Sequence, residues 1–397
     1  METKSLTTLF VISVLTTKMI MPGMPDLPAG MDIPGIGAPT KSMTMDLTSD
    51  KQVNASSKAQ CAVPEGLKLG PKVDLEIDLP VKETPPVGGS TEGTKPTASK
   101  FVMKTYWDCS ETVLPGQPKV IDTEQMMKGM PTGGMMGPGK MRGMKPPTVT
   151  VGDQSHAYWP NGKGGKKIVK DSSSPGLYEL TTNYCGGTSI TFGQGQEFLV
   201  GIDITSPGKG EPNLDKAIKV EWKSVPNAVA YHITAMAGKQ GEMVMWTSSS
   251  KPDMTLDLTG KAFSQTEITS YVEKGILLPA TATACSIPAG IFKDTGAPMI
   301  SMTALGVDKA QEKDGIRTLV IVRSTGMLML GSMGGGMSPD GDSTDPPEEG
   351  TDPTEEVTDP DTSSTDDATP AADDPAPKSA ADKAKDALRK LGGILGR

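Results

Sequence analysis

The chain has 397 residues, a formal net charge of -9 and only 4% aromatic residues, so it has room for two or three domains with modest cores. The acidic excess comes from residues 339–377, which contain many Asp and Glu but no Lys or Arg. Residues 1–338 are nearly neutral, which argues against a nucleic-acid-binding protein that works through a basic surface. The 46 glycines and 34 prolines predict that part of the length is linker.

The N-terminal residues resemble an export signal. Lys4 precedes an apolar run from Leu6 to Leu15, which has the length of a signal-peptide core and is too short to span a bilayer. We expect residues 1–20 to be a signal peptide or short anchor, and the protein to be secreted or located in the periplasm or cell envelope. An ordinary buried strand is the competing interpretation. Residues 21–41, rich in Pro, Gly and Met, are expected to form an extended tether.

Residues 42–208 have the pattern of a β domain. Within 72–80, Val73, Leu75, Ile77 and Leu79 alternate with acidic residues, as in a half-buried strand. Other short segments in this region are strand-like, and none shows a clear amphipathic helical period. The sequence therefore predicts a first antiparallel β-sandwich domain over 42–208.

A methionine-rich and glycine-rich stretch, at 126–147, interrupts this domain between two strand-like segments. Thioether sulfur is a soft ligand that favours Cu(I), so the stretch is either a loop insertion or a copper site. The candidate metal ligands are Met127, Met130, Met141 and Met144, and their use would make the chain a periplasmic Cu(I)-binding protein. The nearby Lys128, Lys140 and Arg142 would repel a cation.

Residues 212–326 are expected to form a second β domain. In the segment 217–238, a strand containing Trp222 is followed by a short turn and a strand that begins with Tyr231. This arrangement resembles the opening strands of a fibronectin type III domain. The resemblance implies an immunoglobulin-like or fibronectin-like sandwich, so the expected fold is mainly β, with two antiparallel β-sandwich domains.

The C-terminal part is expected to be a spacer followed by a helix. Residues 327–377 begin with a Gly/Met stretch and continue with repeated Thr-Asp-Pro steps, whose charge and proline content predict a disordered acidic spacer. In 378–397, Ala384, Leu388, Leu391 and Leu395 share one helical face, which predicts a short amphipathic helix that docks weakly on a membrane or a partner.

The cysteines and histidines are few. In an exported protein the four cysteines could form two disulfides, and a pair drawn from Cys61, Cys109 and Cys185 is preferred because these residues share the first predicted domain. The two histidines, His156 and His232, accompany no recognisable catalytic motif, and His232 is expected to be a solvated surface residue. We therefore expect no enzymatic activity.

The sequence leaves three functional hypotheses. The first is a non-catalytic structural or adhesive protein of the envelope or exterior, whose protein or surface partner is unknown and which uses no cofactor. The second is Cu(I) binding by the methionine-rich loop. The third is a carbohydrate-binding sandwich, in which Tyr106, Trp107, Tyr158 and Trp159 would stack on sugar rings from one exposed face.

Overall fold

The computed structural model describes residues 7–20, 36–79, 101–122, 155–160, 168–208, 213–239, 241–252, 258 and 260–330. The chain divides into two compact units, Met1–Met337 and Ser338–Arg397, and every described residue belongs to the first. The loop at 126–147, most of the tether at 21–41, most of the spacer at 327–377 and the C-terminal helix are predictions that fall outside the described residues. Residues 327–329, at the start of the predicted spacer, form the end of the last strand.

The described part of the chain is mainly β, which confirms the predicted fold class at that level. The strands are β1 (Thr8–Ile20), β2 (Thr40–Ser49), β3 (Ala59–Ala62), β4 (Lys72–Ile77), β5 (Val102–Trp107), β6 (Lys119–Asp122), β7 (Ser155–Trp159), β8 (Gly176–Thr182), β9 (Gly187–Phe192), β10 (Ile204–Ser206), β11 (Ile218–Trp222), β12 (Ala230–Lys239), β13 (Glu242–Thr247), β14 (Leu278–Pro279), β15 (Ala284–Ile287), β16 (Met299–Leu305), β17 (Lys309–Lys313) and β18 (Ile316–Met329). The described residues also form one α-helix, α2 (Gln265–Glu273), and two 3-10 helices, η1 (Glu65–Leu67) and η2 (Gln194–Gln196).

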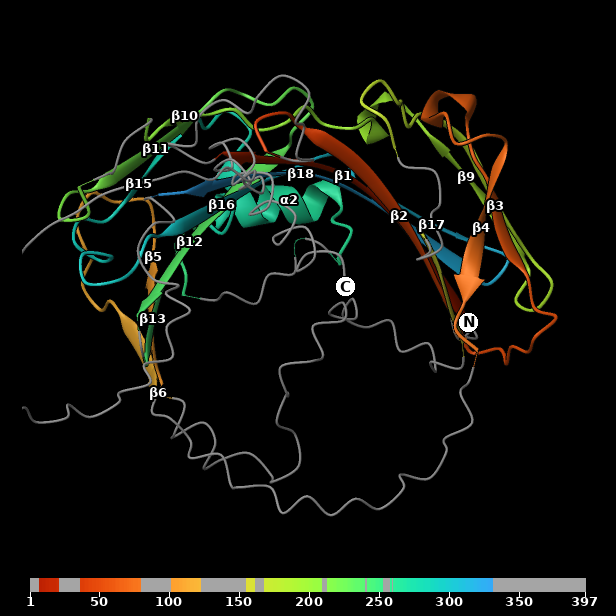
Figure 1. The fold of residues 1–397 in the computed structure, drawn as a ribbon, viewed down its shortest axis with the longest axis horizontal. Helices are drawn as coiled ribbons and strands as arrows, with labels where there is room; N and C mark the ends of the chain where they lie inside the picture. The colour runs from red at the N-terminus through yellow and green to blue at the C-terminus, as the bar shows by residue number, and fades with distance from the viewer. Residues whose placement is uncertain are drawn as a thin grey trace, which may run out of the picture. The chain divides into compact units, whose positions relative to one another are not determined.

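Most strands belong to one 15-stranded mixed sheet (Figure 1). Its order is β6-β5-β13-β12-β16-β18-β1-β2-β7-β4-β3-β8-β9, with β14 paired to β12 and β17 paired to β18. Strands from 42–208 and from 212–326 share this sheet, because β5 pairs in parallel with β13. The two predicted sandwich segments are therefore joined by backbone hydrogen bonds.

The apolar N-terminal run lies inside this sheet as β1. β1 pairs in parallel with β18 from Thr8 to Ile20 and antiparallel with β2 on its other side. Phe10, Ile12 and Val14 are almost completely buried, as expected for a strand that is covered on one face and flanked by neighbours. The residues that predict a signal-peptide core thus supply one of the longest strands of the fold.

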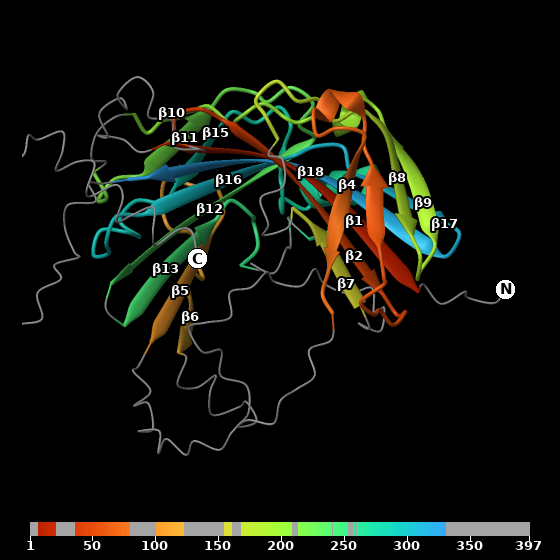
Figure 2. The ribbon, with the colours of Figure 1, turned by 45° about the vertical axis from the view of Figure 1, so that its right-hand side comes forward.

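A second, three-stranded sheet covers part of the large one. Its order is β10-β11-β15, and Figure 2 shows these strands beside the large sheet. Its buried side chains join those of the large sheet in one core. Trp222 of β11 packs edge-on against Tyr231 of β12, with ring centroids 5.6 Å apart. The Tyr231 hydroxyl also accepts a hydrogen bond from the Val225 N–H at 2.9 Å. The predicted strand-turn-strand segment therefore crosses from one sheet to the other.

The disulfide differs from the predicted pairing. Cys109 is bonded to Cys285, and Cys61 and Cys185 are free thiols. The preference for a bond within the first predicted domain was wrong because β5, which leads to Cys109, pairs with a strand of the second segment. The Ser110 N–H then donates to the Ser286 carbonyl at 3.0 Å, which brings Cys109 next to β15.

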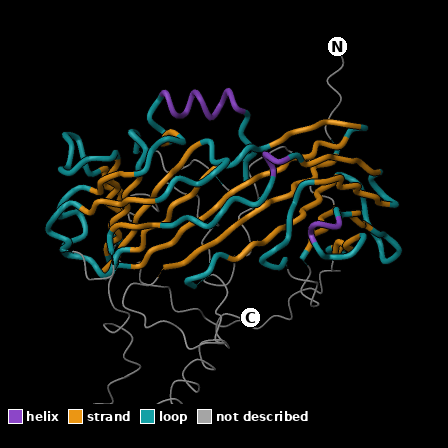
Figure 3. The backbone as a smooth tube through the Cα atoms, turned by 90° about the horizontal axis from the view of Figure 1, so that it is seen from above, coloured by secondary structure: helices purple, strands orange, loops and turns teal. Residues whose placement is uncertain are grey.

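The helix α2 covers one end of the large sheet (Figure 3). It begins after Ser264, whose hydroxyl accepts a hydrogen bond from the Glu267 N–H in a capping box. Ile268 packs in a small apolar cluster with Ala230 of β12 and Leu305 of β16. The helix therefore covers this end of the outward sheet face.

Candidate functional site

The predicted copper ligands of the loop lie outside the described residues. Met127, Met130, Met141 and Met144 belong to a stretch that starts after β6 ends at Asp122. The structure therefore places only the point where this stretch leaves the sheet.

The four aromatic residues proposed for sugar stacking do not form one platform. Tyr106 and Trp107 are consecutive in β5, so their side chains point to opposite faces of the sheet. Six strands separate β5 from β7, which carries Tyr158 and Trp159. Trp159 is also only 4% exposed, so it is a core residue.

His156 is held between two carboxylates on the surface. Its Nδ1 lies 3.1 Å from Asp78 Oδ2, and its Nε2 lies 3.6 Å from Asp46 Oδ1. The ring also stacks on Tyr158. The hydrogen bond with Asp46, supported by Asp78, raises the pKa of His156 above its usual value because both carboxylates favour the imidazolium. This group is a surface ion-pair cluster linking β2, β7 and the end of β4.

His232 is not the solvated residue that the sequence predicts. It is half-buried, and its Nε2 lies 3.0 Å from Thr247 Oγ1. Burial lowers its pKa to about 4, so the ring is neutral at pH 7. The alternation of β12 places His232 outward as expected, but the ring is nevertheless largely shielded from water.

The free thiols have the properties of structural cysteines. Burial raises the pKa of Cys61 to about 12, and burial also raises that of Cys185. A raised pKa lowers the fraction of reactive thiolate at pH 7. Among the described residues, no group of three or more His, Cys, Asp and Glu side chains is arranged to hold a metal ion.

The most unusual surface in the described part of the chain is a row of methionines across four neighbouring strands. Met245 of β13 lies opposite Met236 of β12, Met236 lies opposite Met299 of β16, and Met299 lies opposite Met329 of β18. Directly paired residues of adjacent strands project from the same face of a sheet. The four side chains therefore stand next to one another, and we call them the methionine row.

The row belongs to a wider methionine face on the outward side of the large sheet. Met243 and Met327 lie two residues along their strands from Met245 and Met329, so they project from the same face. Met243 pairs with Met103 of β5, and Met327 pairs with Met19 of β1. All of these side chains are half-buried. The face consists of Met19, Met103, Met236, Met243, Met245, Met299, Met327 and Met329.

The local sequence of each strand explains why the methionines point outward. In β12, β13, β16 and β18, each row methionine is preceded or followed by residues that are buried in the core, such as Ala235, Val244, Ile300 and Leu328. A strand alternates its side chains between the two faces. At these positions the aliphatic residues therefore face the core, and the row methionines project from the opposite, outward face, where they are half-buried.

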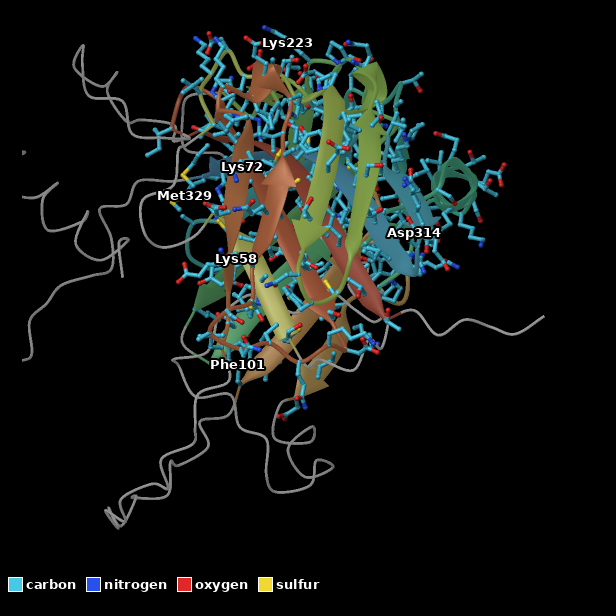
Figure 4. The ribbon with its side chains drawn as sticks, turned by 90° about the vertical axis from the view of Figure 1, so that its right-hand side faces the viewer. Lys58, Lys72, Phe101, Lys223, Asp314 and Met329 are labelled. Atoms are coloured by element: carbon cyan, nitrogen blue, oxygen red, sulfur yellow. A yellow bond between two sulfur atoms is a disulfide. The ribbon has the colours of Figure 1, made fainter. Side chains whose placement is uncertain are left out.

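The described neighbours of the row on the side toward α2 are uncharged. The positions two residues away on the same face are Thr234, Thr247, Ser301 and Met327 on the side toward α2. This composition differs from that of the 126–147 stretch, in which lysine and arginine lie among the methionines. Figure 4 labels Met329 at the end of β18, and Asp314, which precedes the other end of this strand.

Three strands finish at the end of the sheet that carries this face, and in the sequence a methionine-containing stretch follows each of them. These stretches start after Ile20, Asp122 and Leu330, at the ends of β1, β6 and β18. Strand pairing places these three ends on the same side of the sheet along the strand direction. Ile20 pairs with Leu328 and Met299 with Met329, while Asp122 pairs with Val102, which pairs with Glu242. The methionine face could not be predicted from the sequence, because only the strand order brings its members together.

The comparisons with known proteins do not assign this chain to a family. Among the described residues, no helix is both long and apolar enough to cross a membrane. No protein-family model, no curated protein and no solved structure matches the chain.

Proposed function

We propose that this protein is a non-catalytic structural or adhesive protein of the cell envelope or exterior. The observation that carries the proposal is the disulfide between Cys109 and Cys285, which connects residues 176 positions apart in the sequence. Disulfides of this kind persist mainly in oxidising compartments, such as the periplasm and the extracellular space. The large disulfide-linked sheet would serve as a scaffold that presents binding surfaces.

The chemistry of the described residues fits a non-catalytic role. The buried Cys61 thiol donates a hydrogen bond to the Ala62 carbonyl. The largely shielded His232 ring is hydrogen-bonded to the Thr247 hydroxyl, so the two groups do not act together. His156 is occupied by two surface carboxylates. In this proposal, the part of the predicted 327–377 spacer that follows β18 would give reach, and the 378–397 segment would dock on a membrane or partner.

The N-terminal strand is part of the folded protein in this proposal. β1 lies between β2 and β18 with its apolar side chains in the core. A cleavage after residue 20 would remove this strand from the sheet, so we propose that residues 8–20 remain in the exported protein. We also propose that residues 42–208 and 212–326 each form a β-sandwich, and that the second is similar to a fibronectin type III domain.

Thiol trapping in the cells that produce the protein tests this function. Intact cells would be treated with a maleimide reagent of high mass, fractionated and analysed with and without reductant. We expect an envelope or secreted protein with two free thiols and one disulfide, and cross-linking that captures a surface partner. A cytosolic protein with four free thiols, or a specific catalytic activity of the purified chain, would contradict the proposal.

A further inference from the structure

We propose that the methionine row, Met236, Met245, Met299 and Met329, is a binding site for one soft monovalent metal ion, Cu(I) or Ag(I). This site differs from the ligand set predicted in the 126–147 stretch, and it goes beyond the scaffold function proposed above. It is formed by four strands that are hydrogen-bonded to one another, β13, β12, β16 and β18.

The spacing of the row suits shared coordination. Residues directly opposite one another in neighbouring antiparallel strands have Cβ atoms about 4.5–5.5 Å apart. Methionine is unbranched and has three rotatable bonds, so its sulfur can lean toward a neighbour without a change in the backbone. Met236 has a methionine on each side, Met245 and Met299. These three sulfurs can therefore converge on one ion, with Met329 as a fourth ligand next to Met299.

The ligand chemistry selects the class of ion. Thioether sulfur is neutral and soft, and it favours Cu(I) over the hard ions that carboxylates and carbonyls bind. The neighbouring Thr234, Thr247 and Ser301 are uncharged. They neither repel a monovalent cation nor supply the negative charge that a divalent ion would require.

The position of the row lowers the cost of binding. The row methionines are half-buried, so each side chain is partly packed on the molecule and partly exposed. Paired strands hold the four Cα positions in place, so fewer degrees of freedom are lost when an ion binds. This is a physical advantage over ligands that are spread along a glycine-rich stretch.

A titration of the full chain with Ag(I), and with Cu(I) kept reduced by ascorbate, tests the site. A Cys185→Ala background removes the half-buried thiol as a competing ligand, whereas the Cys61 thiol is already buried. We expect one ion per chain. Because Met→Leu keeps an apolar side chain of similar size and removes only the sulfur, Met236→Leu/Met299→Leu should weaken binding by at least about 100-fold.

Two matched controls locate the binding. Met302 is in β16 but is fully buried on the opposite face, so Met302→Leu should leave the affinity unchanged. A variant with leucine at Met127, Met130, Met141 and Met144 should also retain one tightly bound ion. Binding that is lost in this loop variant and retained in the row variant would overturn the proposal.

Two further results of the titration would contradict the site. Absence of binding by the unmodified chain would show that the row is only an apolar surface, as would equal affinity of the chain and its Met236→Leu/Met299→Leu variant. Circular dichroism and thermal unfolding of each variant would verify that the sheet is intact. Leucine at these half-buried positions should change the unfolding midpoint little, so loss of binding can be separated from loss of structure.

Discussion

Arg323 is a charged residue placed in the interior of the fold, beneath the segment that leads into α2. Its Nη1 donates to Asp308 Oδ1 at 2.7 Å and its Nη2 donates to Asp308 Oδ2 at 2.8 Å. The carboxylate also accepts the Phe263 and Val322 N–H groups, both at 2.9 Å. Burying the two charges is tolerable because their hydrogen bonds are satisfied.

We predict that Arg323→Met lowers the free energy of unfolding by about 3–5 kcal/mol, because the Asp308 carboxylate is left buried without its partner. Urea denaturation would measure the change. The matched control is Lys219→Ala, which removes an exposed ion pair with Glu221 and should leave stability nearly unchanged. Equal effects of the two substitutions would contradict this account of the buried pair.

The His156 cluster predicts a pH-dependent contribution to stability. Its pKa in the folded state is raised above the usual value of 6.5 by Asp46 and Asp78. The folded state therefore binds the proton more tightly than the unfolded chain does. The stabilisation is fully present below pH 6.5 and is lost as the pH rises through the raised pKa.

His156→Gln should remove this dependence while keeping a side chain that can donate a hydrogen bond. We expect the difference in unfolding midpoint between the two proteins to be largest in mildly acidic buffer and to shrink at alkaline pH. The facing groups are Asp46 from β2, Asp78 after β4, and Tyr158, on which the ring stacks. A difference that grows with pH would have the wrong sign.

At the scale of elements, β1 should be essential to the fold. Ile12 is fully buried, whereas the next residue, Ser13, is half-exposed in the same strand. We predict that Ile12→Asp costs about 4 kcal/mol or more, since it buries an unpaired charge. Ser13→Asp is the control and should cost far less. Equal tolerance in thermal unfolding would indicate that β1 is not held in the sheet.

The Cys109–Cys285 disulfide should stabilise the fold through the unfolded state. Its sequence separation is 176 residues, so the bond restricts a long loop of the unfolded chain. The double variant Cys109→Ala/Cys285→Ala should lose about 2–5 kcal/mol of unfolding free energy. Reductant should lower the stability of the unmodified protein and leave the double variant unaffected. The same response of both proteins to reductant would argue against the disulfide.

Individual strands could be predicted from local patterns, and their partners could not. Val73 and Leu75 alternate with charged residues and are buried in β4 as expected. Nothing near Phe10 indicates that β1 pairs in parallel with β18, from the far end of the folded unit. Neighbouring strands in a sheet are usually close in sequence, so the order of strands along the chain does not predict this pairing.

At the scale of the whole molecule, pairing between strands that are distant in sequence explains why the methionine row could not be predicted. The sequence draws attention to the methionine stretch at 126–147, because its members are close in sequence. Met236, Met245, Met299 and Met329 are scattered over almost a hundred residues and meet only through four strands. The same strand order separates the aromatic pairs of β5 and β7.

The methionine row is tested most directly by measuring the oxidation of each methionine by mass spectrometry, with and without Ag(I). Half-exposed thioethers should be converted to the sulfoxide by dilute peroxide faster than buried ones, such as Met43, Met45 and Met302. We predict that one equivalent of Ag(I) slows the oxidation of the row methionines and leaves the buried ones unchanged. Unaltered oxidation of the row in the presence of Ag(I), or protection confined to residues 126–147, would contradict the account.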